Sequence, residues 1–251
     1  MIKCSRIYCG LMAAAAFAGL ASAQMEFGGA RNPSLTEVTL ADGNATHFVV
    51  GDGAWGDVLA EMGVMRGADR SRDFEIAGQL YNSRDTIPAA YLFEAARRYA
   101  SFDPDQAVYV FFLARARTLY DAMRCLDSSA TNAVAIISDM AGGDVATYMN
   151  ISDDGTAFAN VTRMQAALDR LQESGETFTG EFSPWWVCSA SDSVFIAASN
   201  EAPMPENEWL KPRNVWPSAQ RQVEQNIERN RALLAVTLGT RELAGGGGQD
   251  N

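Results

Sequence analysis

Residues 86–125, TIPAAYLFEAARRYASFDPDQAVYVFFLARARTLYDAMRC, decide the fold of this chain of 251 residues. Apolar side chains recur in this stretch at the spacing of one helix face. They are Tyr91, Leu92, Ala95, Ala96 and Tyr99 in the first half, and Ala107, Val108, Phe111, Phe112, Ala114, Leu119 and Met123 in the second. The pattern predicts two consecutive amphipathic helices.

Both predicted helices begin with a capping side chain followed by proline. Thr86 precedes Ile87 and Pro88, and Asp103 precedes Pro104. The capping oxygen can accept a hydrogen bond from a free N–H of the first turn, where proline is also tolerated. Because only residues 101–104 connect the two helices, we expect an antiparallel hairpin with alanines at its close contacts.

The hairpin resembles a tetratricopeptide or Sel1-like repeat. Ala95, Ala107, Phe111 and Ala114 match the small, small, aromatic, small spacing of that family, and Tyr91 and Tyr99 lie near its bulky positions. The hairpin also resembles a segment of exported bacterial proteins with an Ile-Pro start and an aromatic-rich second helix. The sequence has no Trp-Leu-Gly opening and no second copy at a fixed period, so the resemblance implies a hairpin within an irregular helical domain.

The rest of the chain predicts a mainly α fold with a few short strands. Strands are expected at residues 46–50 and, around residues 178–198, at 178–187 and 193–198. The alternation at residues 35–40 suggests an edge strand or an extended arm. Helices are expected at residues 57–63, 128–140 and 145–149, with a break at Gly142 and Gly143, and residues 66–75 suggest a polar loop. Two further apolar stripes are Phe158, Val161, Met164, Leu168 and Leu171, and Val223, Ile227, Leu234 and Leu238.

The N-terminus predicts export. Lys3 and Arg6 precede an apolar run, and Ala21 to Ala23 form an A-x-A cleavage site. We therefore expect a signal peptide at 1–23, an extended arm at 24–45, one mainly helical domain at 46–244 and a flexible tail at 245–251. Alanine-rich and lysine-poor composition favours a bacterial periplasm over other exported locations.

Cleavage would leave two cysteines, Cys125 and Cys188, because Cys4 and Cys9 belong to the signal segment. Two thiols in an oxidising compartment usually pair, so a disulfide is expected. The alternatives are buried free thiols or a catalytic cysteine, for which His47 is the one histidine in the chain.

The charge and the motifs of the sequence argue against several classes of function. The formal charge is −11, which disfavours nucleic acid and anionic membrane surfaces as partners. A single histidine excludes multi-histidine metal sites. The sequence contains no G-x-S-x-G, H-E-x-x-H or P-loop motif.

Four features remain as candidate sites, each with a structural alternative. Residues 51–56 read G-x-G-x-x-G, which suggests either a dinucleotide loop or a glycine turn. Residues 153–155 suggest a turn or, less readily, a calcium loop. Trp185 and Trp186 suggest a core pair or a glycan platform. Glu94 suggests a partly desolvated catalytic carboxylate, or an ion pair with Arg97 or Arg98 on a solvated face.

The sequence thus predicts a non-catalytic exported helical protein, without cofactor or metal, that binds another protein. The partner is expected to be basic, and two versions are an envelope adaptor and an immunity-type protein that blocks a toxin. The alternatives are a carboxylate-dependent enzyme acting on cell-wall polysaccharide and a glycan-binding module.

Overall fold

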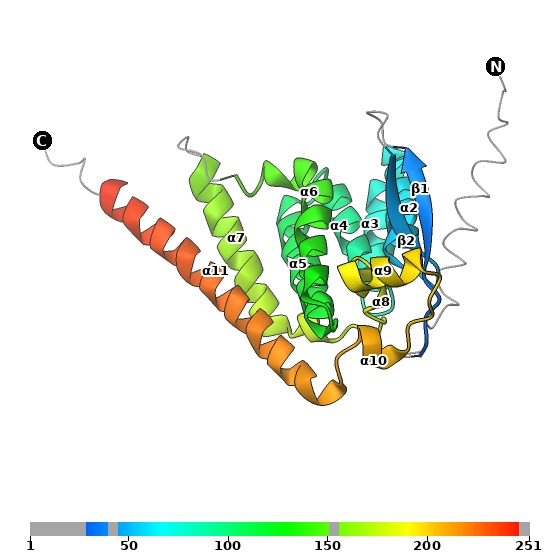
Figure 1. Ribbon diagram of the computed structural model, residues 1–251. Helices are drawn as coiled ribbons and strands as arrows, with labels where there is room; N and C mark the ends of the chain where they lie inside the picture. Colours follow the sequence, from blue (N-terminus) through cyan, green and yellow to red (C-terminus); the bar gives the residue numbers. More distant parts are fainter. Residues whose placement is uncertain (1–28, 40–44, 151–155, 246–251) are drawn as a thin grey trace, which may run out of the picture.

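The computed structural model describes residues 29–39, 45–150 and 156–245 (Figure 1). The predicted signal peptide, the acidic turn at 153–155 and all of the tail beyond Gly245 lie outside these residues. The described chain is mainly α-helical with one two-stranded sheet, which confirms the predicted fold class.

The predicted hairpin is present as α4 (Ala90–Tyr99) and α5 (Pro104–Arg124). Asp103 caps α5 as expected, because its carboxylate accepts a hydrogen bond from the Gln106 N–H at 3.0 Å. The predicted start of α4 is wrong. The Thr86 hydroxyl donates to the Ser83 carbonyl at 3.1 Å, so the preceding turn occupies this side chain and the helix begins only at Ala90.

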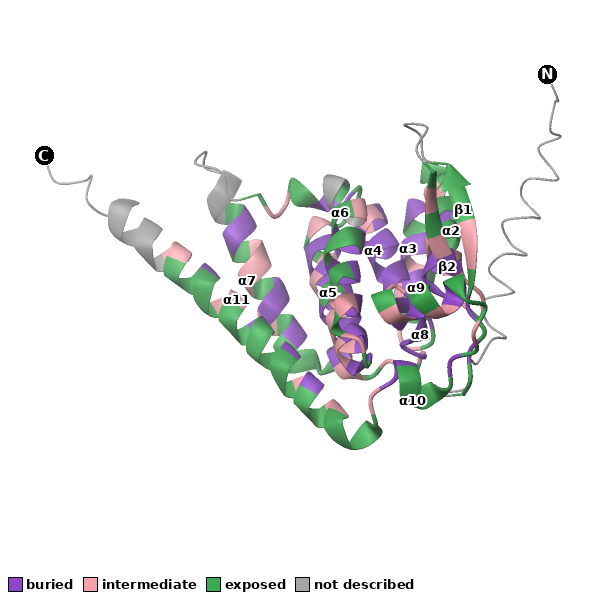
Figure 2. Cartoon of the chain, in the orientation of Figure 1, coloured by how far each residue is buried: buried purple, intermediate pink, exposed green. Residues whose placement is uncertain are grey.

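Helix α5 is buried on nearly every side and lies at the centre of the molecule (Figure 2). The elements packed around it are α4, α6 (Asn132–Ala146), α7 (Thr156–Ser174), α8 (Trp185–Cys188), α11 (Trp216–Gly245) and the 3-10 turns η2 (Ser128–Thr131) and η3 (Glu176–Phe178). A helix that is apolar on most of its surface must be covered in this way to be stable. Helix α6 runs through Gly142 and Gly143, so the predicted break there is wrong.

The N-terminal part places a small sheet against a helix. Strands β1 (Ser34–Thr39) and β2 (Ala45–Val50) are antiparallel, with Leu35 opposite Val49. Helix α2 (Trp55–Arg66) approaches β2 so closely that a Cβ at Gly56 would lie 2.7 Å from the Val49 carbonyl oxygen. Only glycine fits there without a backbone shift.

Helix α3 (Asp73–Asn82) is absent from the sequence prediction. Residues 66–75 were expected to form a polar loop, but η1 (Arg70–Arg72) leads directly into α3. The buried face of α3 consists of Asp73, Ile76, Ala77 and Leu80. A charged residue at its first buried position weakens the apolar periodicity on which the prediction relied.

The strands predicted around residues 178–198 are wrong. This region contains η3, α8 and α9 (Asp192–Ser199). A short apolar run bounded by proline and serine does not distinguish a buried strand from a buried helical turn. The remaining C-terminal elements are α10 (Glu206–Trp209), η4 (Arg213–Val215) and α11, whose buried residues include the predicted Val223, Ile227 and Leu234.

Cys125 and Cys188 are joined in the structure, with their sulfur atoms at 2.07 Å. The bond connects the end of α5 to α8 across 63 positions of sequence. It therefore ties the central helix to the segment that contributes Trp185 and Trp186 to the core.

Replacing both cysteines by serine should lower the free energy of unfolding by about 4 kcal/mol, the chain-entropy value for a loop of this length. Urea unfolding of the double variant and of the oxidised wild type measures this difference. The chemically reduced wild type is the control and should resemble the variant. Equal midpoints for oxidised and reduced wild type would contradict a structural role for the bond.

The Asp127 carboxylate makes a second connection between segments that are distant in sequence. The Asp127 carboxylate accepts hydrogen bonds from the backbone N–H groups of Ser129 and Ser193, both at 2.9 Å, and so links η2 to α9. Burial alone would raise the pKa of Asp127, but these hydrogen bonds outweigh it and lower the pKa to about 2.

Because the folded pKa lies below the unfolded value of about 3.9, this carboxylate stabilises the fold above about pH 4, and the contribution disappears as the pH falls through 2. We expect Asp127→Asn to be less stable than wild type at pH 6 and to approach it at pH 2. Urea titrations at both values test this, and a stability gap independent of pH would contradict it.

Candidate functional site

A groove between α5 and α7 is the candidate site. The two helices run in the same direction and diverge toward their N-terminal ends (Figure 1). The groove has a volume of about 640 Å³. Its lining residues are Asp103, Asp105, Gln106, Tyr109, Ala159, Thr162, Arg163, Ala166, Ala167 and Arg170.

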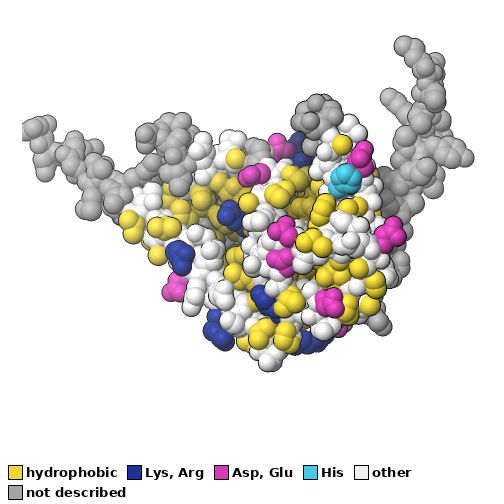
Figure 3. Space-filling view, in the orientation of Figure 1, with side chains coloured by type: hydrophobic (Ala, Val, Ile, Leu, Met, Phe, Trp, Pro, Cys, Tyr) yellow, Lys and Arg dark blue, Asp and Glu magenta, His cyan; other side chains and the backbone are white. Residues whose placement is uncertain are grey.

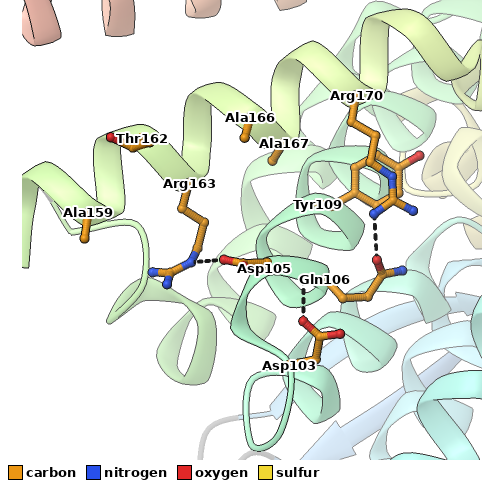
Figure 4. A pocket seen from close by; sticks show the side chains of 10 residues that line it. All are labelled: Asp103, Asp105, Gln106, Tyr109, Ala159, Thr162, Arg163, Ala166, Ala167 and Arg170. Carbon is orange, nitrogen blue, oxygen red and sulfur yellow. Dashed lines mark hydrogen bonds and ion pairs between the residues drawn. The ribbon is translucent and has the colours of Figure 1, made fainter.

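Small side chains from α7 line one wall of the groove, and two arginines extend from the same helix toward α5 (Figure 4). Ala159 and Ala166 are exposed, so they leave room for a ligand to approach the helix backbone closely. Arg163 forms an ion pair with Asp105 at 2.5 Å. Because the Asp105 side chain is 82% exposed, this pair contributes little stability and is readily rearranged.

Arg170 is the most strongly positioned polar side chain in the groove. Its guanidinium lies 3.6 Å from the centre of the Tyr109 ring and donates hydrogen bonds to Gln106 Oε1 at 2.8 Å and to the Tyr81 hydroxyl at 3.4 Å. Within residues 29–39, 45–150 and 156–245, no carboxylate forms an ion pair with it. A fixed, exposed guanidinium of this kind can donate to carbonyl or carboxylate oxygens of a ligand.

From Tyr109 the groove continues into a row of ring contacts that we call the aromatic ladder. Its members, in order, are Tyr109, Tyr81, Tyr99, Phe102 and Phe74, and successive ring centres lie 6.5, 6.4, 5.3 and 5.4 Å apart. All neighbouring rings are tilted or edge-on, an arrangement that aromatic pairs prefer. The outer end is open to solvent, because Phe74 is 77% and Phe102 40% exposed.

A gap on α3 lies between two rings of the ladder. Phe74, Gly78 and Tyr81 follow each other at helical spacing on one face of α3. A Cβ at Gly78 would have no atom within 4 Å, so the space above it is open.

The tyrosine hydroxyls at the inner end of the ladder are hydrogen-bond donors. Tyr109 and Tyr81 donate to the Glu176 carboxylate at 2.9 and 3.1 Å, and Arg84 pairs with the same carboxylate at 3.2 Å. Burial raises the pKa of Tyr109, and the bond to Glu176 raises it further. The Tyr109 hydroxyl therefore stays protonated, and its hydrogen bond to Glu176 fixes the inner end of the ladder.

The candidate carboxylate Glu94 is a structural residue. Its oxygens accept hydrogen bonds from Arg97 at 2.7 and 2.8 Å and from Arg98 at 2.8 Å, and Arg66 lies 3.8 Å away. The expected arginine pairing is present, but on a buried face and not on a solvated one. Arg98, fully buried, also pairs with Asp73 at 2.6 Å. Three guanidinium groups surround Glu94, and no cavity reaches it among the pockets described.

The glycine-rich loop at residues 51–56 is closed by its own chain. Asp57 Oδ2 accepts hydrogen bonds from the Gly51 N–H at 2.8 Å and the Ala54 N–H at 3.1 Å. These are the donors that a dinucleotide phosphate would need. The structure therefore supports the glycine turn, with Trp55 packed in the core and stacked on Trp186 at 6.1 Å.

The tryptophan pair lies in the core, which excludes the glycan platform at this position. Trp185 and Trp186 have no exposed surface. The Trp185 indole donates to the Gly51 carbonyl at 3.2 Å, and the Trp186 indole donates to Asp121 at 2.9 Å. His47 lies on β2, exposed and 3.7 Å from Glu37, far in the fold from the disulfide-bonded Cys125.

Sequence reasoning did not identify the groove or the ladder. Tyr99 was noted only as a hairpin position and Phe102 only as part of the connecting turn, and neither Tyr109 nor Arg170 was singled out. Among residues 29–39, 45–150 and 156–245, no group of three His, Cys, Asp or Glu side chains could hold a metal ion. No helix in the same residues is long and apolar enough to cross a bilayer.

No protein-family model matches the chain, and neither a curated protein nor a solved structure is significantly similar to it. The resemblance of the hairpin to a tetratricopeptide or Sel1-like repeat therefore stays a prediction, and the functional argument rests on the site geometry.

The cluster around Glu94 generates a stability prediction. Arg98→Met should lower the free energy of unfolding by about 3–5 kcal/mol, because it removes the fully buried partner that Glu94 and Asp73 share. Arg221→Met, at an exposed position of α11, is the matched control and should change it by less than about 0.5 kcal/mol. Equal effects in urea unfolding would contradict a structural role for the cluster.

Proposed function

We propose that this chain is an exported, non-catalytic protein that binds another protein through the α5–α7 groove and the aromatic ladder. The observation that carries the proposal is their continuity, since Tyr109 belongs to both. Tyr109 itself is buried, so an extended segment of a partner would contact the groove on one side of this ring and the exposed rings of Phe74 and Phe102 on the other. Such segments bind along aromatic-lined grooves, where pockets between rings select apolar side chains.

Each part of the surface has a distinct task in this proposal. The alanines of α7 let the partner backbone lie close to the helix, and Arg170 donates to its carbonyl oxygens. The gap above Gly78 takes an apolar side chain, and the exposed rings of Phe74 and Phe102 cover it. Aromatic anchors of this kind provide a large share of the affinity of protein interfaces.

Export is supported by two independent features. The N-terminal sequence has the charge, apolar run and cleavage site of a signal peptide. The buried Cys125–Cys188 bond fits an oxidising compartment such as the bacterial periplasm. The net charge of −11 steers a basic partner toward the protein, whether the protein acts as an envelope adaptor or blocks a toxin.

Glu94 is enclosed by arginines, so the enzyme alternative lacks its candidate carboxylate. Trp185 and Trp186 are buried, so the glycan-binding alternative lacks its candidate aromatic residues. The exposed rings of the ladder could still stack on sugars. A test of the proposal therefore has to distinguish a protein partner from a glycan.

Photo-crosslinking tests the proposed surface directly. Phe74 and Ala166 are each replaced by p-benzoylphenylalanine in the full chain, and Val64, which is 70% exposed on α2, is the matched control position. We expect one protein to cross-link at positions 74 and 166 and not at 64. With that partner purified, Phe102→Ser should weaken binding about tenfold, because a partly exposed anchor is lost.

Thermal unfolding of Phe102→Ser should remain close to wild type, which separates a binding defect from a folding defect. Three results would contradict the proposal: equal cross-linking at all three positions, unchanged affinity in Phe102→Ser, or binding of cell-wall glycan fragments in place of a protein.

A further inference from the structure

Two stretches of the sequence contain acidic residues and no basic ones. No lysine, arginine or histidine occurs at residues 125–162 or at residues 171–210. The second stretch contains α9 and α10, and its acidic residues there are Asp192, Glu201, Glu206 and Glu208, all exposed. In Figure 3, acidic and hydrophobic side chains gather over these two helices.

Among residues 29–39, 45–150 and 156–245, nothing covers one face of α9. Phe195 is 41% and Ile196 61% exposed, and Leu126 beside them is 49% exposed. Hydrogen bonds hold these segments together, since Leu126 N–H donates to the Trp209 carbonyl at 2.9 Å and Ser193 N–H donates to Asp127 at 2.9 Å. We call the three apolar residues with Asp192, Glu201, Glu206 and Glu208 the α9 face.

The α9 face is an apolar centre with an acidic rim. Within the described ranges, none of its four carboxylates forms an ion pair. Arg31, which is buried and lies 5.8 and 5.6 Å from the ring centres of Trp185 and Trp209, interacts electrostatically with Glu206.

Glu201 occupies an unusual backbone position on this rim. It ends α9 in the left-handed conformation, with φ of 50°. Ala202 N–H donates to the Ala197 carbonyl at 3.0 Å and Glu201 N–H to the Ala198 carbonyl at 3.2 Å, which is the Schellman pattern. Glycine is the usual residue there, so glutamate places a charge on the rim at a conformational cost.

We propose that the α9 face is a second docking surface, whose occupant is a basic protein that presents lysine or arginine around an apolar side chain. Complementary charge steers such a partner and sets its orientation, and burial of Phe195 and Ile196 provides the affinity. The α9 face is built from elements other than those of the α5–α7 groove. Two surfaces of different chemistry on one chain suit an adaptor that holds two proteins.

A pair of helical peptides tests the α9 face without knowledge of the natural partner. One peptide is an amphipathic helix with leucines at positions i, i+3, i+4 and i+7 on one face and lysines on the other, and its twin has glutamate at every lysine. The lysine peptide should bind the mature protein at low salt and dissociate as the salt rises, whereas the glutamate twin should not bind. Phe195→Ser with Ile196→Ser should weaken binding at least about tenfold while leaving the thermal midpoint unchanged.

A matched charge control separates this surface from a general effect of net charge. Glu201→Lys, Glu206→Lys and Glu208→Lys together should weaken binding about tenfold. Glu173→Lys, Glu224→Lys and Glu228→Lys change the net charge equally at exposed positions of α7 and α11, and should weaken it less than about twofold. Equal losses in the two triple variants, or binding of the glutamate twin, would overturn the proposal.

The same titration distinguishes this surface from the groove. Phe74→Ala, which alters the aromatic ladder, should leave the affinity for the lysine peptide unchanged. If Phe74→Ala abolished binding while the α9 variants did not, the peptide would occupy the groove and the α9 face would have no docking role. Failure of cross-linking at positions 74 and 166 would instead count against the groove alone.

Discussion

Burial of α5 on nearly every side is the constraint on which the rest of the structure depends. The helix carries Arg117, Asp121 and Arg124 into the interior, and each must find partners there. Arg117 donates to Asp85 at 2.7 Å and to the backbone carbonyls of Arg84 and Glu176. Asp121 accepts from the Trp186 indole and pairs with Arg124. These contacts determine where the neighbouring loops and α8 can lie.

The position of the groove follows from this arrangement. Arg117 of α5 donates a hydrogen bond to the Glu176 carbonyl of η3. Because α7 ends just before η3, this bond holds the C-terminal end of α7 close to α5. Toward its N-terminal end α7 diverges from α5, which leaves the alanine-lined space open (Figure 1). From the buried Tyr109 the aromatic ladder leads away from this space to the exposed rings of Phe74 and Phe102.

Local signals predicted the parts of the fold that depend on neighbouring residues. Asp103 with Pro104 marks the start of α5, and the stripe of Val223, Ile227 and Leu234 marks α11. Trp185 and Trp186 were misplaced on a strand, because burial on all sides removes the periodicity that separates strand from helix. Pairing of Glu94 with arginine could be predicted from spacing along α4, whereas its burial depends on α2 and α3, which pack over it.

The groove and the aromatic ladder could not be predicted from the sequence for a related reason. The ladder gathers Phe74, Tyr81, Tyr99, Phe102 and Tyr109 from three helices, and no spacing in the sequence predicts that their rings meet. Charge was more informative, since the absence of basic residues from residues 171–210 is visible in the sequence and becomes one surface when α9 and α10 fold together. Both proposed surfaces thus combine local composition with a tertiary arrangement that only the structure provides.

Hydroxyl-radical footprinting of the full mature chain, alone and with its purified partner, tests the central claim most directly. The method reports the solvent exposure of individual aromatic side chains. We expect oxidation of Phe74 and Phe102 to fall strongly in the complex. Leu233, which is 62% exposed on α11, is the control, and its oxidation should stay the same. Unchanged oxidation of both phenylalanines in a fully formed complex would contradict binding along the aromatic ladder.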